Sequence, residues 1–218
     1  MDNIKSLRGM RYPDEYLIKM FYKEGLNNVG GRVLELGCGS ANNLMHFAAY
    51  GWDVTGVDYD SECVAAGQHN LRTLNFSGSL FQFDLNNGLP YLQGPFQVFL
   101  APSVLYYLNR KSVEVLMMKI AGLLAPGGLF YLRMRLPDDH RYGRGELKEL
   151  NAFRLTCDYT GEFGALNVFY DEYELLDLLK RTFGVEASSI TRLRIAYENL
   201  QNGIVIRNSD IVIWGRLP

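Results

Sequence analysis

The chain has 218 residues, of which 48% are hydrophobic and 21% are charged, and its net charge at pH 7 is −2. This composition is typical of a globular domain with a sizeable core, and it excludes a disordered chain. The small net charge argues against long-range attraction to nucleic acid or to an anionic membrane. The three cysteines lie far apart without metal-like spacing, which favours a reducing compartment and predicts no metal site. We find no apolar leader and no membrane-length apolar run, and therefore expect a cytoplasmic protein with no membrane partner.

The first 30 residues predict one short helix after a polar start. Proline and acids at 13–15 are typical of a helix N-terminus. Apolar residues then recur at helical spacing from Tyr16 to Phe21, and Gly25 marks the end of the pattern.

The stretch at 32–44 predicts a buried strand, a glycine turn and the start of a helix. Gly37 and Gly39 allow the backbone to turn sharply and to approach a ligand without an intervening side chain. The free N–H groups of the following helix can hold an anion. Glu35 lies inside the strand, where a carboxylate needs a hydrogen-bonding partner.

This motif resembles the nucleotide-binding motif of class I S-adenosylmethionine-dependent methyltransferases, an acid followed by Gly-x-Gly-x-Gly. Here the pattern reads Glu35, Gly37, Gly39 and then Ala41, so the third glycine is replaced. The dinucleotide pattern Gly-x-Gly-x-x-Gly fits less well, because Asn42 stands at its third glycine. The resemblance implies S-adenosyl-L-methionine as cofactor and S-adenosyl-L-homocysteine as product. An ordinary strand-to-helix turn of another α/β protein is the alternative.

Two further predicted strands, at 52–58 and 80–85, end in or near an acid. In nucleotide-binding α/β folds an acid at the end of the second strand accepts hydrogen bonds from ribose hydroxyls, a role that suits Asp58. We expect this carboxylate at an exposed strand end, with no part in the core. The resemblance implies that Asp84 binds the adenine amino group and that the backbone of Leu85 reaches the ring. The alternatives are a helix cap for the first acid and a plain loop aspartate for the second.

Strands and helices continue to alternate up to residue 136. A fourth strand is predicted at 96–102, and a helix stripe follows from Val113 to Leu124. The sequence Leu-Leu-Ala-Pro-Gly-Gly-Leu at 123–129 should end this helix, and a fifth strand is predicted at 129–134. The same sequence is a second point of resemblance to the family.

The later part of the chain has a weaker pattern. Residues 152–157 and 165–170 could pair as a short hairpin. Asp171 with Glu174 resembles a capping box at the start of a helix.

The final two strands are predicted at 193–197 and 211–214. Asn202-Gly203 between them has turn chemistry, within a connection that we expect to be too long for a tight hairpin.

Together these elements predict one domain, 1–218, with an α/β, doubly wound, three-layer sandwich. The resemblance implies the Rossmann-like methyltransferase fold, with a seven-stranded, mostly parallel sheet and an antiparallel last strand. It also implies that the N-terminal cap helix region, 1–30, covers the cofactor. We expect the insert at 137–170 to cover the substrate pocket, because open α/β sheets bind ligands at strand ends.

The resemblance places the cofactor at the ends of the first four strands. The residues expected to bind it are Glu35, Gly37, Cys38, Gly39, Asp58, Tyr59, Asp84, Leu85 and Ala101. Candidate substrate contacts are Tyr12, Tyr106 and Arg141. His140 is the catalytic candidate, since an oxygen nucleophile can need a base and this histidine follows the fifth strand.

These features favour methyl transfer to a small-molecule acceptor, such as a sugar or another metabolite, and no nucleic-acid partner. The alternatives are an RNA or protein methyltransferase, a non-catalytic adenosylmethionine-binding protein and a nicotinamide-dependent oxidoreductase. The sequence specifies neither the acceptor atom (oxygen, nitrogen or carbon) nor the oligomeric state.

Overall fold

A computed structural model of the protein describes residues 2–201 and 203–218. The α-helices are α1 (Glu15–Lys23), α2 (Asn42–Ala49), α3 (Ser61–Thr73), α4 (Arg110–Ala121) and α5 (Glu172–Phe183). The strands are β1 (Arg32–Leu36), β2 (Asp53–Asp58), β3 (Gly78–Gln82), β4 (Phe96–Pro102), β5 (Leu124–Arg135), β6 (Gly145–Glu149), β7 (Ala152–Leu155), β8 (Leu166–Val168), β9 (Ile190–Gln201) and β10 (Ile204–Arg216). No helix within the described ranges is long and apolar enough to cross a membrane.

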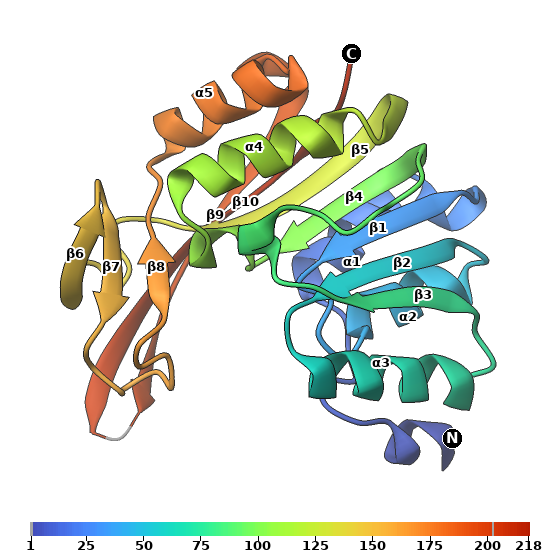
Figure 1. Ribbon diagram of the computed structural model, residues 1–218, viewed down its shortest axis with the longest axis horizontal. Coiled ribbons are helices and arrows are strands. Elements are labelled where there is room, and N and C mark those ends of the chain that lie inside the picture. Colours follow the sequence, from blue (N-terminus) through green and yellow to red (C-terminus); the bar gives the residue numbers. More distant parts are fainter. Residues whose placement is uncertain (1, 202) are drawn as a thin grey trace.

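The main sheet has seven strands in the order β3-β2-β1-β4-β5-β10-β9 (Figure 1). Strands β1 to β5 are mutually parallel, and β10 pairs antiparallel with β5. This arrangement confirms the predicted mostly parallel sheet with an antiparallel last strand. The strand order reverses between β1 and β4, which makes their carboxyl ends the topological switch point where open α/β sheets bind ligands.

Helices cover both faces of this sheet (Figure 1), and a separate hydrophobic cluster fills each layer. Successive residues of a strand point to opposite faces, so Leu34 and Leu36 of β1 pack with α4 and α5. Val33 of the same strand and Val54 of β2 pack with α1, α2 and α3. The three-layer sandwich predicted from the sequence is therefore confirmed.

Strand β5 begins earlier than predicted, because Pro126 and Gly127 lie inside it. Gly127 has a positive φ of 69°, and the pairing of β4 with β5 shifts register between Phe96 and Val98. The segment expected to separate helix from strand therefore forms an irregular start of the strand.

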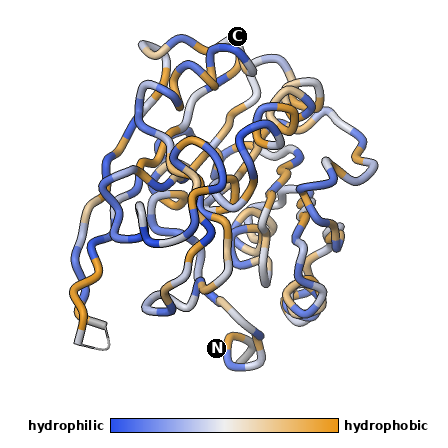
Figure 2. The backbone as a smooth tube through the Cα atoms, turned by 60° about the vertical axis from the view of Figure 1, so that its left-hand side comes forward, coloured by the Kyte–Doolittle hydropathy of each residue, from blue (hydrophilic) through white to orange (hydrophobic). Residues whose placement is uncertain are grey.

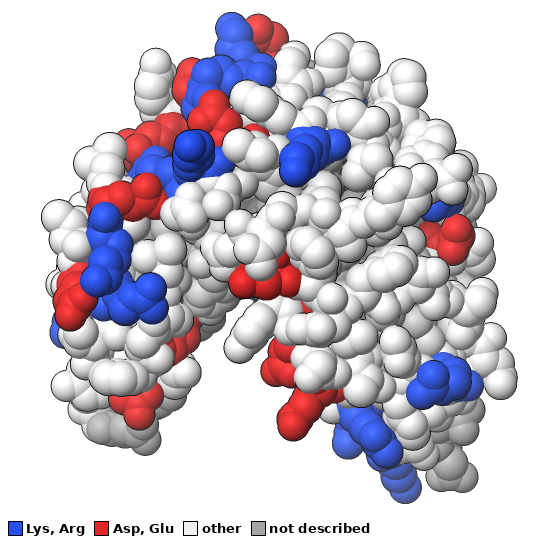
Figure 3. Space-filling view, in the orientation of Figure 1, with Lys and Arg blue, Asp and Glu red and all other residues white. Residues whose placement is uncertain are grey.

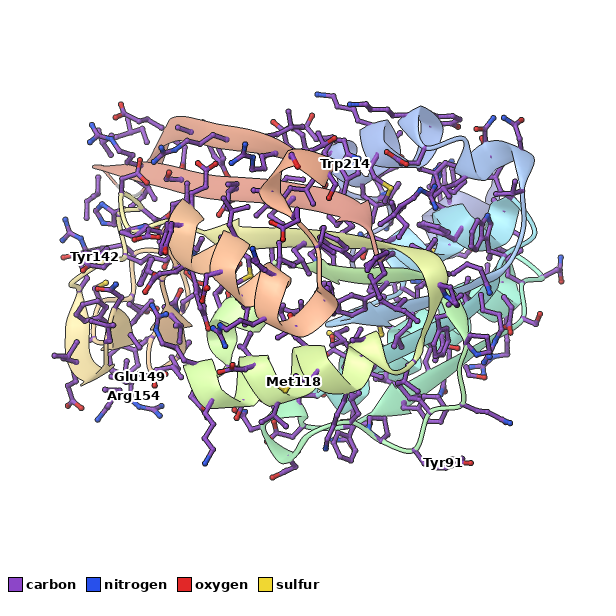
Figure 4. All side chains as sticks on the ribbon, turned by 90° about the horizontal axis from the view of Figure 1, so that it is seen from above. Tyr91, Met118, Tyr142, Glu149, Arg154 and Trp214 are labelled. Carbon is purple, nitrogen blue, oxygen red and sulfur yellow. The ribbon has the colours of Figure 1, made fainter. Side chains whose placement is uncertain are left out.

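The hairpin of β9 and β10 is much longer than predicted. Ile204 pairs with Gln201, so the expectation of a connection too long for a tight hairpin is wrong; Asn202 lies outside the described residues. Figure 2 shows that the outer end of this hairpin has the colour of hydrophobic residues. Leu200 and Val205 of the hairpin are exposed. At its other end, Trp214 lies beside α1 (Figure 4), and its Nε1 donates to Glu24 Oε1 (3.1 Å).

The insert forms a second, three-stranded antiparallel sheet in the order β6-β7-β8, beside the main sheet (Figure 1). The pairing of β7 with β8 confirms the predicted hairpin. Strand β6 is missing from the sequence prediction, because its residues, Gly145–Glu149, are largely exposed and lack an apolar alternation.

Candidate cofactor site

A cavity of about 940 Å³ lies at the carboxyl ends of the parallel strands. Five of the residues predicted to bind the cofactor line it: Gly37, Asp58, Tyr59, Asp84 and Leu85. The opposite wall comes from the insert, through Arg154 of β7 and residues 161–166 of the loop into β8. Figure 3 shows this hollow between the region of β6–β8 and that of α3, with acidic side chains at its margin.

A second cavity of about 580 Å³ adjoins the first at the glycine turn. Gly37 and Ser103 line both cavities, and Gly39 and the predicted substrate residue Tyr12 line the second. Ser103, which follows β4, has a left-handed φ of 59° although it is not glycine. Such backbone strain concentrates at ligand sites, but no pattern in the sequence indicates it.

The glycine turn has the geometry that its sequence predicts. Gly37 and Gly39 have φ angles of 67° and 50°, which L side chains rarely adopt. The N–H groups of Gly37 and Cys38 both donate to Val57 O (2.8 and 3.1 Å), which fixes the turn to the end of β2. A Cβ at position 37 would lie 2.7 Å from the side chain of Val104, so only glycine fits there.

Ala41, where the family motif has glycine, begins α2 with a left-handed φ of 64°. Its side chain is fully buried against α3, at a point where α3 carries Gly67. A Cβ on Gly67 would lie 3.2 Å from the Cβ of Ala41 and 2.7 Å from Leu80 Cδ1. A glycine on the neighbouring helix therefore provides the space that the motif's own glycine would otherwise provide.

Asp58 is half-buried at the end of β2, and both of its carboxylate oxygens already accept a backbone N–H. Gly39 N donates to Oδ2 (2.8 Å) and Asp60 N to Oδ1 (3.0 Å). The expectation of an exposed carboxylate is wrong, because Asp58 is half-buried and ties the glycine turn to β2. The cap of α3 is Asp60, whose Oδ1 accepts from Glu62 N (2.8 Å). Each Asp58 oxygen keeps a second lone pair for a ligand.

Asp84 lies two residues beyond β3 and caps a short 3₁₀ turn over Leu85–Asn87. Its Oδ1 accepts from the backbone N and the Nδ2 of Asn86, both at 2.9 Å. Its Oδ2 has no partner within residues 2–201 and 203–218. One oxygen of Asp84 is therefore used within the turn, while the other is free to accept a hydrogen bond from a ligand.

Glu35 lies behind the site and lines neither cavity. It is 1% exposed, its Oε1 accepts from Asn43 Nδ2 (2.6 Å), and its Oε2 has no described partner. Burial raises the pKa of this carboxyl to about 8, and the negative charges of Asp58 and Asp14 raise it further. The hydrogen bond from Asn43 acts in the opposite direction and lowers the pKa. Asn43 does line the second cavity, so it connects the buried acid to that space.

The structure does not bring the side chains of Cys38 and Ala101 to either cavity. Both are buried, at 1% and 0% exposure, and Cys38 Sγ lies only 2.7 Å from where a Cβ on Gly56 would be. Burial also raises the pKa of the Cys38 thiol, which keeps it protonated.

The N-terminal segment is held at the second cavity by side chains that follow the glycine turn. Ser40 Oγ donates to Met10 O (2.9 Å), and Asn42 Nδ2 donates to Tyr12 O (3.0 Å). Asn43 Oδ1 accepts from the backbone N of Asp14 (2.9 Å). Asn42, which fits the dinucleotide motif poorly, thus has a role of its own in this chain.

Asp14 fixes α1 to the end of β5, a cluster that sequence reasoning missed. Its Oδ1 caps α1 and accepts from Tyr131 OH (2.8 Å), and its Oδ2 pairs with Arg133 Nη1 (2.8 Å). Arg133 also pairs with Asp210 of β10 (2.7 Å). Only the proline and acids at the helix start could have pointed to this cluster.

His140, the catalytic candidate, is placed elsewhere. After β5 the chain turns along β10, where His140 N donates to Arg207 O (2.8 Å). The imidazole lines a separate hollow of about 640 Å³ together with Asp138 and Arg144, and neither cofactor cavity includes it. Burial and Arg144 lower the pKa of His140.

The other two substrate candidates lie one layer behind the first cavity. Tyr106 is 5% exposed and its OH accepts from Arg135 Nη2 (3.3 Å), whereas the adjacent Tyr107 lines the cavity. Arg141 is 9% exposed and its charge is paired with Asp139 (2.9 Å) and with Glu162.

Comparisons with known proteins agree with this geometry. Residues 33–128 match the family model described as "Methyltransferase domain". The chain is 25% identical over 145 residues to the probable S-adenosyl-L-methionine-dependent methyltransferase TehB of Haemophilus influenzae, covering 62% of this chain and 50% of TehB. It is 26% identical over 111 residues to ribosomal RNA small subunit methyltransferase C of Alcanivorax borkumensis, covering 49% of this chain and 33% of that protein. The chain thus spans half or less of the length of these curated relatives.

Solved structures show the same fold. The crystal structure of TehB from Haemophilus influenzae has a TM-score of 0.66 at 16% identity, covering 94% of this chain and 63% of TehB. A methyltransferase from Methanosarcina mazei has a TM-score of 0.65 at 20% identity, covering 87% of this chain and 94% of its own. Residues 33–128 thus match a methyltransferase domain, and the glycine turn and the strand-end acids of this chain follow the motif of the class I S-adenosylmethionine-dependent methyltransferases.

Proposed function

We propose that this protein transfers a methyl group from S-adenosylmethionine to a small-molecule acceptor. The observation that carries the proposal is that the glycine turn, Asp58, Asp84 and the insert all line one cavity. Its volume, about 940 Å³, is near the upper end of small-ligand pockets, roughly 300–1,000 Å³. That volume leaves room for an acceptor beside a cofactor.

The residues present fit the expected cofactor. The second lone pairs of the Asp58 oxygens suit the two hydroxyls of a ribose, and Asp84 Oδ2 suits an amino group. The open space at Gly39, where no atom lies within 4 Å of a Cβ position, admits a close approach to the backbone.

The cofactor supplies a methyl group on a sulfonium, which is its own leaving group. The protein's part is then to hold the two reactants in line and to keep water out. We assign binding to Gly37, Asp58 and Asp84, and enclosure of the acceptor to Tyr107 and the loop at 161–166. His140 is not part of this proposal, because it lines another hollow.

A small acceptor is favoured over RNA or protein. The insert forms a wall of the cavity, which restricts the space beside the strand ends. The net charge of −2 gives no general attraction for a nucleic-acid backbone. The likeness to TehB over 62% of this chain supports S-adenosylmethionine as the methyl donor, while the likeness to a ribosomal RNA methyltransferase covers 49%.

Two measurements test the proposal. Calorimetry should show binding of S-adenosylhomocysteine and no binding of nicotinamide dinucleotides. A metabolite screen with a radiolabelled methyl donor should then show label transfer to a small molecule. Binding of a nicotinamide dinucleotide without binding of S-adenosylhomocysteine would refute it. Turnover on RNA or protein, with none on small molecules, would refute the acceptor class alone.

A further inference from the structure

A carboxylate of the chain itself forms part of the wall of the first cavity. Glu162 lies on the loop between β7 and β8 and lines the same cavity as Asp58 and Asp84. Its side chain is 15% exposed. If Glu162 moved aside, the residues behind it would therefore line the cavity at this point.

Two guanidinium groups and two hydroxyl groups converge on this carboxylate. Its Oε1 accepts from Arg135 Nη1 (3.1 Å) and Tyr107 OH (2.5 Å). Its Oε2 accepts from Arg141 Nε and from Thr160 Oγ1 (3.0 Å). Burial alone would raise the pKa of Glu162, but Arg135, Tyr107 and Arg141 hold it below its usual value. The surroundings are therefore arranged to bind an ionised carboxylate.

Arg135 depends on Glu162 for its charge compensation. Its side chain is 7% exposed, and Glu162 is its only carboxylate partner within the described ranges. Its other contacts are neutral, to Asn167 Oδ1 and Tyr106 OH, and its Nε is buried without a partner. A buried cation that loses its partner is strongly destabilising, so Glu162 can leave only if another anion replaces it.

The loop that carries Glu162 has little packing of its own. Gly161 and Gly164 have φ angles of 74° and 78°, with no atom within 4 Å of their Cβ positions, and Phe163 is 68% exposed. Arg154, labelled in Figure 4 on the insert, fixes the far side of the loop through Gly164 O (2.8 Å). The backbone of the loop is tied to β7 by Gly164 N, which donates to Leu155 O (2.9 Å). The carboxylate of Glu162 is the side-chain contact that joins the loop tip to Arg135 and Tyr107.

We propose that the methyl acceptor carries a carboxylate group, which displaces Glu162 and binds Arg135 and Tyr107 in its place. This inference rests on the proposed methyl transfer and specifies the class of acceptor. A neutral molecule cannot displace Glu162 without leaving Arg135 unpaired, so the same contacts reject it. A carboxylate is favoured over a phosphate, because the position is shaped around a planar group with two oxygens and one negative charge.

Benzoate and its neutral analogue benzamide are suitable probes, with binding measured by calorimetry. Glu162→Gln keeps the size of the side chain and removes the competing charge. We expect this variant to bind benzoate at least tenfold more tightly than wild type, and to gain nothing for benzamide. Adding Arg135→Gln to it should abolish the gain. Glu146→Gln, an exposed glutamate on β6 of the same insert, should behave as wild type.

Unchanged benzoate affinity in folded Glu162→Gln would overturn the proposal, as would binding of inorganic phosphate but not of benzoate. If this variant fails to fold by circular dichroism, Glu162→Asp withdraws the carboxylate by one methylene and should give a smaller gain in the same direction. No gain there overturns the proposal equally. S-adenosylhomocysteine binding by wild type is measured in parallel. Its absence would refute the cofactor assignment, whereas a missing benzoate gain with S-adenosylhomocysteine bound refutes only this inference.

Discussion

The carboxylate of Asp58 accepts a hydrogen bond from the backbone N–H of Gly39, with 2.8 Å between Gly39 N and Asp58 Oδ2. The residue assigned to the cofactor's ribose thus also holds the turn on which the cofactor is expected to lie. Binding and local stability are therefore linked at one side chain.

Asp58→Ala should raise the dissociation constant for S-adenosylhomocysteine at least tenfold, because each lost charge-assisted hydrogen bond is worth roughly 1.5–3 kcal/mol. The free energy of unfolding should also fall, by about 1–3 kcal/mol, since the N–H of Gly39 loses its acceptor. Asp58→Asn keeps an acceptor oxygen, so its free energy of unfolding should fall only slightly. Its affinity for S-adenosylhomocysteine should still fall, because the charge is lost. Calorimetry and urea unfolding measure the two effects. Asp171→Ala is the control, because it removes the cap of α5 and this residue lines neither cavity. A dissociation constant for Asp58→Ala within twofold of wild type would remove Asp58 from the site.

Glu35→Gln should reduce the pH dependence of stability. The pKa of Glu35 is raised from 4.5 to about 8 in the folded protein, so the protonated folded state is favoured. Its contribution to stability is complete below about pH 4.5 and is lost as the pH rises through about 8. The glutamine oxygen can still accept from Asn43. The free energy of unfolding of the variant, taken relative to that of wild type, should therefore rise by at least roughly 2 kcal/mol from pH 5 to pH 9, because one pKa unit corresponds to about 1.4 kcal/mol.

Urea unfolding at several pH values provides the measurement for Glu35. The exposed Glu15→Gln variant serves as control. A constant difference between Glu35→Gln and wild type across this range would show that the buried carboxyl does not titrate as inferred.

Ala41 and Gly67 should be coupled energetically. Ala41→Gly relieves a left-handed φ of 64° and should raise stability by about 0.5–1 kcal/mol. Gly67→Ala places a Cβ 3.2 Å from that of Ala41 and 2.7 Å from Leu80, and should cost about 1–3 kcal/mol. The double variant should recover part of this cost, because one of the two crowding atoms is gone. Unfolding of all four proteins gives the coupling energy, and strict additivity would contradict the packing described.

Asp14→Ala should lower the free energy of unfolding by about 2–4 kcal/mol, because it removes both the cap of α1 and a charged partner of Arg133. Asp14→Ser retains a capping oxygen without the ion pair, and its loss should be clearly smaller. Thermal and urea unfolding distinguish the two variants. Equal losses would mean that the capping oxygen contributes nothing and that the ion pair with Arg133 provides the stabilisation.

The five parallel strands, the glycine turn and the acids at or just beyond the ends of β2 and β3 could be predicted because their patterns are local. Glycines at positive φ, apolar runs and capping acids are dictated by neighbouring residues. Asp171 and Glu174 illustrate this, since the capping box predicted from their spacing is present. Whether a side chain faces the cavity is a different matter. It depends on how the chain leaves each strand.

That dependence explains the residues that sequence reasoning placed less well. A 3₁₀ turn at Leu105–Tyr107 turns Tyr107 into the cavity and Tyr106 behind it. His140 lies outside both cofactor cavities because residues after β5 pair with β10, which is a contact between distant parts of the chain. Glu162 carries no local signal, since its partner Arg135 lies on a different sheet.

The attachment of the N-terminal segment to Ser40, Asn42 and Asn43 has a consequence for proteolysis. Arg8 and Arg11 in this segment are exposed sites for trypsin, and cleavage there requires the segment to detach from side chains that follow the glycine turn. A ligand seated on the turn stabilises those anchors. Addition of S-adenosylhomocysteine should therefore slow tryptic cleavage of this segment, with no need for an acceptor to be known.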